Sequence, residues 1–278
     1  MGADGKRLFP PQSPAEARQE IQAVLGASPQ QRGEERSRWW LDGIRRHIPW
    51  LQHKALSTVW RELERLGVVY KRGRRAVHSP DPDYDRKLAE VQRVSQQVRA
   101  EPQRWVLLYQ DELTYYRRPT VAQGYALRGK HQVCAWQGWG SNTRRRIGAV
   151  LDAVSGRVIA HQSARCGRHE LIALYRQVLD AYPHAERIYI VQDNWPVHFH
   201  ADIQAALLHT RLERLYLPTY APWTNPIEKL WRWLYHDILH LHSWADDWLG
   251  LQTAVSAWLS QFQQGSLDLL RYVGLYPT

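Results

Sequence analysis

Three segments of this chain each place one acidic side chain at the end of an apolar run. Asp111 closes the first run, Asp193 closes the second, and Glu228 closes a proline-rich segment that begins at Leu217. Carboxylate oxygens are the ligands that Mg²⁺ and Mn²⁺ prefer, and two such ions can act together on a phosphodiester. Carboxylates delivered by three separate elements therefore predict a metal-dependent enzyme that cuts DNA.

Length and composition set bounds on the class of protein. A chain of 278 residues with 44% apolar content can form one large core or two smaller domains. It has no apolar run long enough to span a membrane, and its first residues lack the apolar segment of a signal peptide. The two cysteines, Cys134 and Cys166, form no ligand-spaced pair, which excludes a zinc cluster and fits a reducing cytoplasm.

The charge of the chain favours a polyanionic partner. The formal net charge is +10, and the excess of basic residues is greatest in the N-terminal third. Contacts between basic side chains and phosphates release counterions, so a basic region of this kind is attracted to nucleic acid. The N-terminal third is therefore predicted to contact DNA.

The same third of the chain has the pattern of three helices. They are predicted over 14–25, 37–48 and 56–66, with Ser13 capping the first and Pro49 ending the second. The third carries an apolar stripe at helical spacing, formed by Leu56, Val59, Leu63 and Leu66, and a polar, basic outer face. Two helices joined by a tight turn, one with such a face, are typical of a helix-turn-helix that sets one helix in the major groove.

Eight side chains of this region are candidates for DNA contact. Four lie on the outer face of the third helix, and four lie in the basic segment after it, which could form a small wing or a phosphate-gripping arm. They are Ser57, Thr58, Arg61, Arg65, Lys71, Arg72, Arg74 and Arg75. An ordinary helical hairpin with a solvated charge run would show the same pattern, and the residues alone leave both interpretations open.

From Trp105 onward, apolar strands alternate with helices. Ser79-Pro-Asp-Pro-Asp83 predicts a linker, and a connecting helix follows over 84–100. Strands are predicted over 105–110, 146–154, 157–162, 187–191 and 212–217, and helices over 167–181, 196–208 and 226–240. A hairpin followed by alternating helices and strands predicts an α/β domain with a mixed sheet. Sites in such sheets lie at the carboxyl ends of strands, where Asp111 and Asp193 are expected.

Each acidic residue also has a purely structural explanation. Asp111 could be a turn residue at a strand end, and Asp193 could do the same with Asn194. Asn225 as N-cap and Glu228 at the third helical position would form a capping arrangement that needs no catalysis. The joint occurrence of three such residues at one predicted sheet edge favours a catalytic site.

Among the residues around the predicted site, some allow two interpretations. Glu112 is excluded, because a continuing strand would direct it to the opposite face of the sheet. His198 lies about one helical turn into the helix that follows the second carboxylate, where it could face a scissile phosphate or be a structural or surface histidine. Arg144-Arg-Arg146 could grip DNA or form a solvated run before a strand. Asn194, His198 and Asn225 are retained as candidate neighbours of the active site.

Together these motifs resemble the DDE transposases of bacterial insertion sequences in the mariner superfamily. The resemblance is carried by Tyr109-Gln-Asp-Glu112, by Val191-Gln-Asp-Asn194 with His198, and by Leu217-Pro-x-Tyr-x-Pro-x-x-Asn-Pro-Ile-Glu228. It extends to Arg118-Pro119, Gly124-Tyr125, Arg128-Gly129-Lys130 and the segment 77–84, and so covers about residues 37–240.

The resemblance implies a ribonuclease H-like catalytic domain with Asp111, Asp193 and Glu228 as catalytic triad and metal ligands. It also implies cut-and-paste movement of a DNA element, with insertion at TA dinucleotides. The partners would be double-stranded DNA, both the terminal repeats of the element and the target, and a homodimer would bring the two ends together. The metal chemistry requires Mg²⁺ or Mn²⁺, two ions in all. The expected location is the bacterial cytoplasm, at the nucleoid.

The expected organisation has three parts. Residues 1–78 would form a small all-α helix-turn-helix domain, winged-helix-like, residues 79–103 a linker and connecting helix, and residues 104–278 the catalytic α/β domain. Enzymes of this family usually carry two helix-turn-helix units, and the first is expected to be missing here, which bears on recognition of the element's ends. The alternatives are a catalytically inactive, transposase-derived DNA-binding protein and a ribonuclease H-like nuclease that cuts hybrids or single strands.

Overall fold

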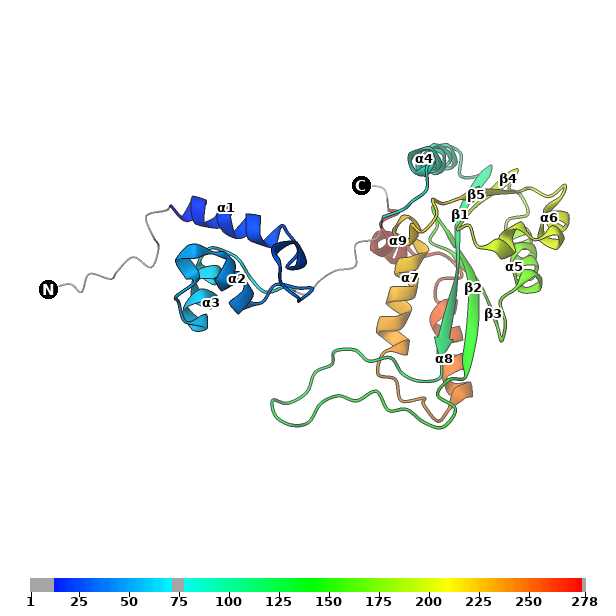
Figure 1. The fold of residues 1–278 in the computed structure, drawn as a ribbon. Coiled ribbons are helices and arrows are strands. Elements are labelled where there is room, and N and C mark those ends of the chain that lie inside the picture. Colours follow the sequence, from blue (N-terminus) through cyan, green and yellow to red (C-terminus); the bar gives the residue numbers. More distant parts are fainter. Residues whose placement is uncertain (1–12, 72–77, 277–278) are drawn as a thin grey trace. The chain divides into compact units, whose positions relative to one another are not determined.

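The chain forms two compact units. The computed structural model describes residues 13–71 and 78–276. Contacts between Cα atoms divide the chain into residues 1–75 and 76–278 (Figure 1). Within the described ranges, no helix is long and apolar enough to cross a membrane.

The first unit packs three helices around a small apolar core. They are α1 (Pro14–Leu25), α2 (Leu41–His47) and α3 (Leu56–Arg65). α1 begins as predicted, because the Ser13 hydroxyl accepts from the Glu16 amide and the Glu16 carboxylate accepts from the Ser13 amide. Buried side chains of all three helices meet in one cluster, which includes Ala17, Ile21, Val24, Ile44, Val59 and Leu63.

Two predictions for this unit need correction. The second helix begins at Leu41, not at Ser37, because Trp40 has an extended backbone with φ −134° and ψ 162°. The Arg36 guanidinium lies 4.5 Å from the centroid of the Trp40 ring. This cation–π contact joins two residues of the segment that precedes the helix. Leu56, predicted on the apolar stripe, is 44% exposed, because it is the first residue of α3 and the core begins at Val59.

The second unit is built on a five-stranded mixed sheet with the order β3-β2-β1-β4-β5. The strands are β1 (Trp105–Tyr116), β2 (Arg144–Asp152), β3 (Val158–Ser163), β4 (Arg187–Gln192) and β5 (Leu212–Tyr216). β1, β2 and β3 pair antiparallel, whereas β4 and β5 continue the sheet parallel to β1. The mixed sheet predicted from the sequence is therefore present.

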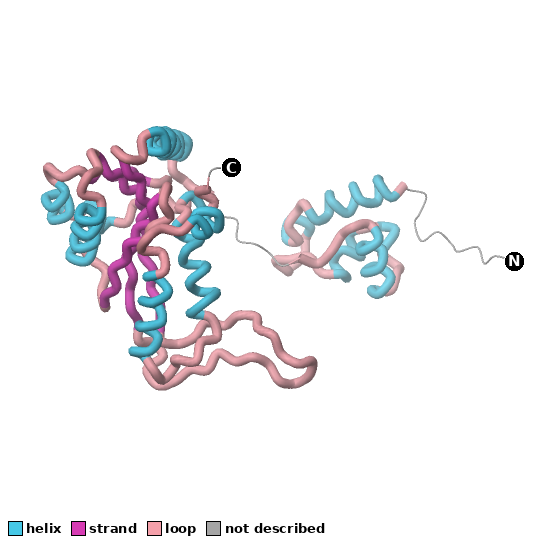
Figure 2. Tube along the Cα trace, turned by 180° about the vertical axis from the view of Figure 1, so that it is seen from behind, coloured by secondary structure: helices cyan, strands magenta, loops and turns pink. Residues whose placement is uncertain are grey.

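Helices cover both faces of this sheet, as the tube in Figure 2 shows. One face is covered by α5 (Arg168–Ala181) and α6 (Ala201–Leu207), and the other by α4 (Tyr84–Ala100), α7 (Ile227–Leu234), α8 (Trp248–Ser260) and α9 (Leu267–Val273). Leu108 of β1 packs in the core under α5, whereas Leu107 and Tyr109 pack in the core under α4 and α7. Alternation along β1 therefore decides which layer each polar residue of this strand faces.

β1 is longer than predicted, and its length changes the position of Asp111. The strand continues past Gln110 because its pairing with β2 runs as far as Tyr116 opposite Arg144. Asp111 therefore lies inside β1, opposite Ala149, and not at the carboxyl end of its strand as predicted. β4 pairs with β1 only through Tyr109 and then ends, so Asp111 still lies next to the carboxyl end of a parallel neighbour.

Two predicted helices are interrupted. The helix expected over 196–208 is a 3₁₀ turn, Pro196–Phe199, followed by α6, because His200 is extended and its ring accepts a hydrogen bond from the Asp202 amide at 3.1 Å. The helix expected over 226–240 is α7 followed by a π-helical turn, Tyr235–Leu239. α8 and α9, which complete the core beside α7, have no counterpart among the predicted elements.

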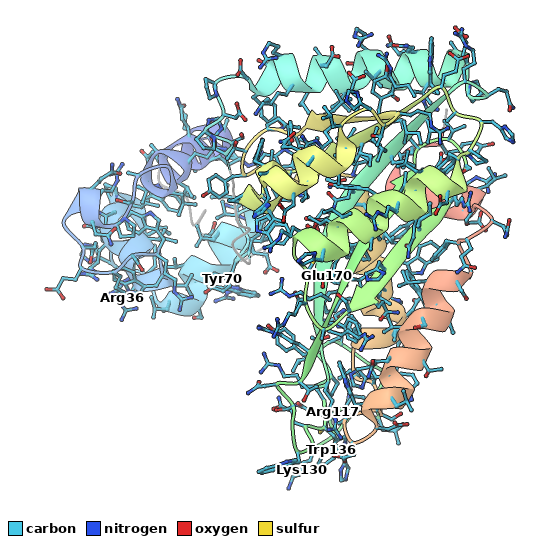
Figure 3. The ribbon with its side chains drawn as sticks, turned by 90° about the vertical axis from the view of Figure 1, so that its right-hand side faces the viewer. Arg36, Tyr70, Arg117, Lys130, Trp136 and Glu170 are labelled. Carbon is cyan, nitrogen blue, oxygen red and sulfur yellow. The ribbon has the colours of Figure 1, made fainter. Side chains whose placement is uncertain are left out.

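A long loop, residues 117–143, connects β1 to β2. At its base, Arg117 Nε donates a hydrogen bond to the Ala245 carbonyl at 2.6 Å. Farther along, Figure 3 shows Lys130 and Trp136 at the end of the loop that is remote from the sheet. The Trp136 side chain is 76% exposed. No residue of this loop belongs to the apolar core clusters found among the described residues.

Gly156, in the turn between β2 and β3, provides a stability prediction. Its φ is +70°, and a Cβ there would lie 2.3 Å from the backbone oxygen of Ser266. Gly156→Ala is expected to lower the free energy of unfolding by about 2–4 kcal/mol, measured by urea denaturation, because backbone must move. Gly274→Ala is the matched control: its φ is +85°, but the nearest group is the flexible Lys229 Nζ at 3.3 Å. That variant should lose only about 1 kcal/mol, and equal losses would contradict the clash.

Candidate active site

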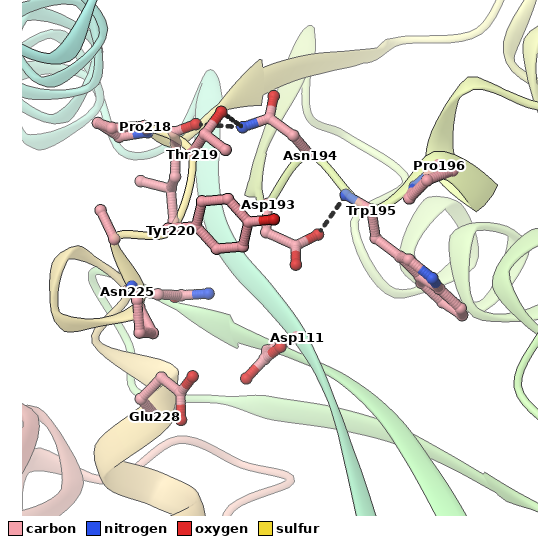
Figure 4. Close-up of a pocket in the computed structure, with 13 residues that line it drawn as sticks. Asp111, Asp193, Asn194, Trp195, Pro196, Pro218, Thr219, Tyr220, Asn225 and Glu228 are labelled. Atoms are coloured by element: carbon pink, nitrogen blue, oxygen red, sulfur yellow. Dashed lines mark hydrogen bonds between the residues drawn. The ribbon is translucent and has the colours of Figure 1, made fainter. Parts of the chain in front are cut away.

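One cavity of the second unit brings the three predicted carboxylates together. Its volume is about 480 Å³. Its lining residues are Asp111, Asp193, Asn194, Trp195, Pro196, Leu217, Pro218, Thr219, Tyr220, Ala221, Pro222, Asn225 and Glu228. Figure 4 shows the carboxyl groups of Asp111, Asp193 and Glu228 directed into the same space from β1, from the loop after β4 and from α7.

Asp111 reaches the cavity from the middle of β1. Its Oδ2 accepts a hydrogen bond from Trp231 Nε1 at 2.8 Å. Burial, followed by the charge of Glu228, raises the pKa of Asp111 to about 7, and the charge of Asp193 adds to this rise. Burial and the neighbouring negative charges make the ionised form of this carboxyl group unfavourable. A cation bound nearby would stabilise that form.

Asp193 lies immediately after β4, and its side chain is 58% exposed. Its Oδ1 accepts a hydrogen bond from the Trp195 amide at 2.9 Å and lies 3.3 Å from His198 Nε2. Burial alone would raise the pKa of Asp193, but the hydrogen bonds from His198 and Trp195 outweigh it and lower the pKa below its ordinary value. Asp193 is therefore the carboxylate of the three that is held ionised by the protein itself.

Glu228 enters the cavity from the first turn of α7. Burial raises its pKa, the charge of Arg232 opposes this rise, and the charge of Asp193 adds to it. The capping explanation for this residue is wrong: Pro226 is the N-cap, and no side chain caps α7. The Asn225 side chain instead donates from Nδ2 to the Gln110 carbonyl at 2.9 Å, which ties the start of α7 to β1. This long-range hydrogen bond positions the start of α7, the helix that carries Glu228, relative to β1.

The candidate neighbours have different surroundings. Asn194 donates from Nδ2 to the Leu217 carbonyl at 2.7 Å, and so links the loop after β4 to the proline-rich segment. Asn225 is 5% exposed, and its Oδ1 is buried without a hydrogen-bond partner in the described part of the chain. His198 is 0% exposed, which excludes the interpretation of a surface histidine.

Glu112 lies away from the cavity, on the opposite face of β1 as predicted. Its Oε1 accepts from Gln110 Nε2 at 2.6 Å and lies 3.9 Å from His198 Nε2. Burial, followed by the charge of Asp111, raises the pKa of Glu112 to about 8. Glu112 is therefore a second, partly buried carboxyl group that does not line the cavity.

The candidate DNA-contacting residues belong to the first unit. Ser57, Arg61, Arg65 and Lys71 are exposed and Thr58 is half-buried. Arg65 Nη2 forms an ion pair with Glu62 Oε2 at 3.0 Å. Arg72, Arg74 and Arg75, predicted as part of a wing or arm, lie outside the described residues. Arg144–Arg146 begins β2 and is therefore part of the sheet, not a run before a strand.

Two features of the cavity were not predicted from the sequence: the hydrogen bond from Trp231 and the backbone conformation of Tyr220. Trp231, the donor to Asp111, lies three residues after Glu228 in α7 and is 3% exposed. Its spacing puts it on the same helical face as Glu228, and this spacing is the signal by which the sequence could have identified it. Tyr220, which lines the cavity, has a left-handed φ of 54°, and no local sequence signal indicates this conformation.

The ligand types in the cavity fit a hard divalent cation. Three carboxylates face it, and the unpaired Asn225 Oδ1 is a further oxygen donor in its lining. Among the residues that the structure describes, no group of three or more His, Cys, Asp or Glu side chains is arranged to hold a metal ion. The carboxylates share a cavity without converging on one point, so water or substrate oxygens would have to complete any coordination sphere.

Comparisons with known proteins agree on the class of this unit. The profile of the family described as DDE superfamily endonuclease matches residues 106–247. The insertion element IS630 uncharacterized 39 kDa protein of Shigella sonnei is 26% identical over 231 residues, which cover 82% of this chain and 66% of that protein. The chain therefore spans just under two thirds of the length of this relative.

Solved structures show the same fold. The Mos1 transposase paired-end complex with left transposon end has a TM-score of 0.65 and 17% identity, over 98% of this chain and 78% of that chain. The Mos1 mariner paired-end complexes with Mn and with Mg both have a TM-score of 0.64, at 17% and 14% identity and with the same coverage. The ribonuclease H-like mixed sheet with flanking helices is thereby confirmed. Since the family profile spans more than half of the chain and includes all three cavity carboxylates, the chain belongs to the DDE superfamily of endonucleases.

Proposed function

We propose that this protein is a transposase that cleaves DNA strands and transfers them, and that the cavity of Asp111, Asp193 and Glu228 is its active site. The observation that carries the proposal is the meeting of these three carboxylates in one cavity of a DDE endonuclease domain. The names of the similar proteins support the same activity, because one belongs to an insertion element and the others are transposase complexes with transposon DNA.

We assign Mg²⁺ or Mn²⁺ to this cavity, in keeping with the Mos1 complexes with Mn and Mg. Asp111, Asp193 and Glu228 would hold the metal, two ions in the proposed arrangement. When bound, the metal would activate the attacking group and stabilise the negative charge of the leaving 3′-oxygen. No protein nucleophile is required, and in strand transfer the freed 3′-hydroxyl would replace water.

The residues of the chain set the geometry for this chemistry. Asp193 presents an ionised, 58% exposed carboxylate to the cavity, whereas Asp111 is partly buried. Asn225 and Asn194 fix the two loops that border the cavity through hydrogen bonds to the Gln110 and Leu217 carbonyls. A rigid border of this kind would hold a scissile phosphate in one orientation relative to the carboxylates.

The partner would be double-stranded DNA, both the terminal repeats of the element and a target containing TA. We assign repeat binding to residues 1–78 as a helix-turn-helix domain, with the linker and connecting helix over 79–103 and catalysis over 104–278. The exposed candidates of α3, together with Lys71, would contact this DNA. A homodimer would hold two ends at once, and the enzyme would act at the nucleoid.

Cleavage of a duplex that carries the element's terminal repeat tests the proposal. The wild-type protein should cut at the repeat boundary with Mg²⁺ or Mn²⁺ but not with EDTA. Asp193→Asn should reduce cleavage by about 1000-fold or more, since an amide is a poor ligand, while DNA affinity stays nearly unchanged. Asp268→Asn is the matched control, because the Asp268 side chain is 82% exposed and forms an ion pair with Arg271 on the surface of α9.

The outcomes separate the alternatives. DNA binding without cutting under any metal would indicate an inactive, transposase-derived DNA-binding protein. Cutting of hybrids or single strands without dependence on the repeat would indicate a nuclease. Wild-type cleavage by Asp193→Asn would show that the assigned carboxylates are wrong.

A further inference from the structure

Two aromatic ring nitrogens, which do not line the cavity, lie beside its two aspartates. Trp231 Nε1 donates to Asp111 Oδ2 at 2.8 Å, and His198 Nε2 lies 3.3 Å from Asp193 Oδ1. Neither donor lines the cavity. Both are buried, with Trp231 3% exposed and His198 0% exposed. Neither ring can therefore reach a substrate, and each can act only through its aspartate.

We propose that His198 and Trp231 are positioning residues, each of which orients one aspartate so that the pair is preset to hold divalent cations. This inference rests on the proposed function, since it takes Asp111 and Asp193 as the metal ligands. It extends that function to two residues that do not touch metal or DNA. It also replaces the idea that His198 faces a scissile phosphate.

Two nitrogen atoms approach the same oxygen of Asp193. The Trp195 amide at 2.9 Å and His198 Nε2 at 3.3 Å both approach Oδ1. Rotation of this carboxylate would break the hydrogen bond from the Trp195 amide and move Oδ1 away from His198 Nε2. The second oxygen, Oδ2, is thereby turned toward the cavity, which is the orientation a metal ligand needs.

The His198 ring is itself held in place. Its edge meets the Trp195 ring with centroids 5.7 Å apart and an interplanar angle of 86°. The His198 carbonyl accepts a hydrogen bond from Arg214 Nη1. Tyr175 OH donates to Gln192 Oε1 at 2.9 Å and lies 3.5 Å from His198 Nδ1, too far for a strong hydrogen bond. The ring is thus fixed by packing and by its backbone, with Nε2 directed at Asp193.

Trp231 plays the equivalent part on the other side of the cavity. It belongs to α7, which also supplies Glu228 one turn earlier. The same helix therefore delivers one carboxylate and holds a second, so that a shift of α7 would move both. The hydrogen bond from the indole N–H holds the Asp111 carboxylate in one orientation relative to this helix.

The first test is the affinity for Mn²⁺ of the full-length protein, measured by electron paramagnetic resonance. Trp231→Phe keeps the aromatic ring and removes the N–H, so it should weaken Mn²⁺ binding about 10–100-fold. Trp258→Phe is a matched control, since Trp258 Nε1 donates to Asp237 Oδ2 at 3.0 Å away from the cavity. The control should bind Mn²⁺ as the wild type does.

The second test is rescue at His198. Gln can place an amide N–H near the position of Nε2, whereas Leu has no donor. His198→Leu should weaken Mn²⁺ binding about 10–100-fold, and His198→Gln should restore most of it. Equal affinities for the two variants would show that His198 only fills space, and would overturn its assigned role.

A measurement on the wild type alone guards against variants that fail to fold. In ¹H–¹⁵N spectra, the Trp231 indole signal should shift on addition of Mg²⁺, whereas the Trp258 signal should not. An unmoved Trp231 signal while Mg²⁺ binds, or Trp231→Phe with wild-type Mn²⁺ affinity, would overturn the inference. If the wild type binds no Mn²⁺, or Asp193→Asn binds it equally well, the proposed function itself fails.

Discussion

Asp111→Asn is expected to abolish DNA cleavage and, at the same time, to make the metal-free protein more stable. Cleavage should fall by about 1000-fold or more, because the amide is a poor ligand for a hard cation. Stability should rise because the variant no longer buries a carboxyl group near Glu228 and Asp193, whose charges, with burial, raise the pKa of Asp111 to about 7. In EDTA at pH 8, the free energy of unfolding should increase by roughly 2–4 kcal/mol.

The contribution of Asp111 to the free energy of unfolding depends on pH. The pKa of Asp111 rises from an ordinary 3.8 to about 7 on folding, so the folded state binds this proton more tightly than the unfolded state. The stability that the protonated group contributes is complete below pH 4 and is lost as the pH rises through 7. Urea denaturation in EDTA should therefore show a decline over this window in the wild type and a shallower decline in Asp111→Asn, in which Glu112 still has a raised pKa.

Glu112→Gln is the matched comparison. Glu112 is also partly buried, with a pKa raised to about 8 by burial and by the charge of Asp111, but it does not line the cavity. Glu112→Gln should stabilise the metal-free protein in the same direction between pH 4.5 and 8 and should retain cleavage. Loss of cleavage in Glu112→Gln equal to that in Asp111→Asn would contradict the separation of the two carboxyl groups by the sheet.

Removal of three basic side chains of the first unit should strongly weaken DNA binding. The triple variant Arg61→Ala, Arg65→Ala, Lys71→Ala should bind terminal-repeat DNA on the order of 100-fold more weakly at moderate salt. Each lost phosphate contact also removes a released counterion. The slope of log affinity against log salt, measured by fluorescence anisotropy, should therefore fall by about 3.

A triple variant of the second unit controls for net charge. Arg86, Arg93 and Arg271 each form an ion pair with a carboxylate three residues away, at 3.0, 2.8 and 2.9 Å. Their replacement by Ala removes the same number of charges but should leave the salt slope nearly unchanged. If both triple variants lost the same affinity and slope, net charge and not the α3 face would account for binding.

The sequence alone was sufficient for the local features of this fold. Apolar runs predicted the bounds of β2, β3, β4 and β5 within two residues and the start of β1, because alternation and β-propensity depend on near neighbours. The capping box at Ser13 fixed the start of α1, since its donors and acceptors lie within one turn. The three carboxylates were identifiable because each stands at a change of pattern, and each does line the same cavity.

The tertiary structure decided what those residues contact. The length of β1 depends on pairing with β2, which local sequence does not specify, and this pairing placed Asp111 inside a strand beside the end of β4. The hydrogen bond from Trp231 to Asp111 joins residues far apart in sequence, as does that from Asn225 to the Gln110 carbonyl. Propensity and periodicity report only on neighbouring residues, whereas the site depends on strand register and helix placement, which are set by packing of the whole unit.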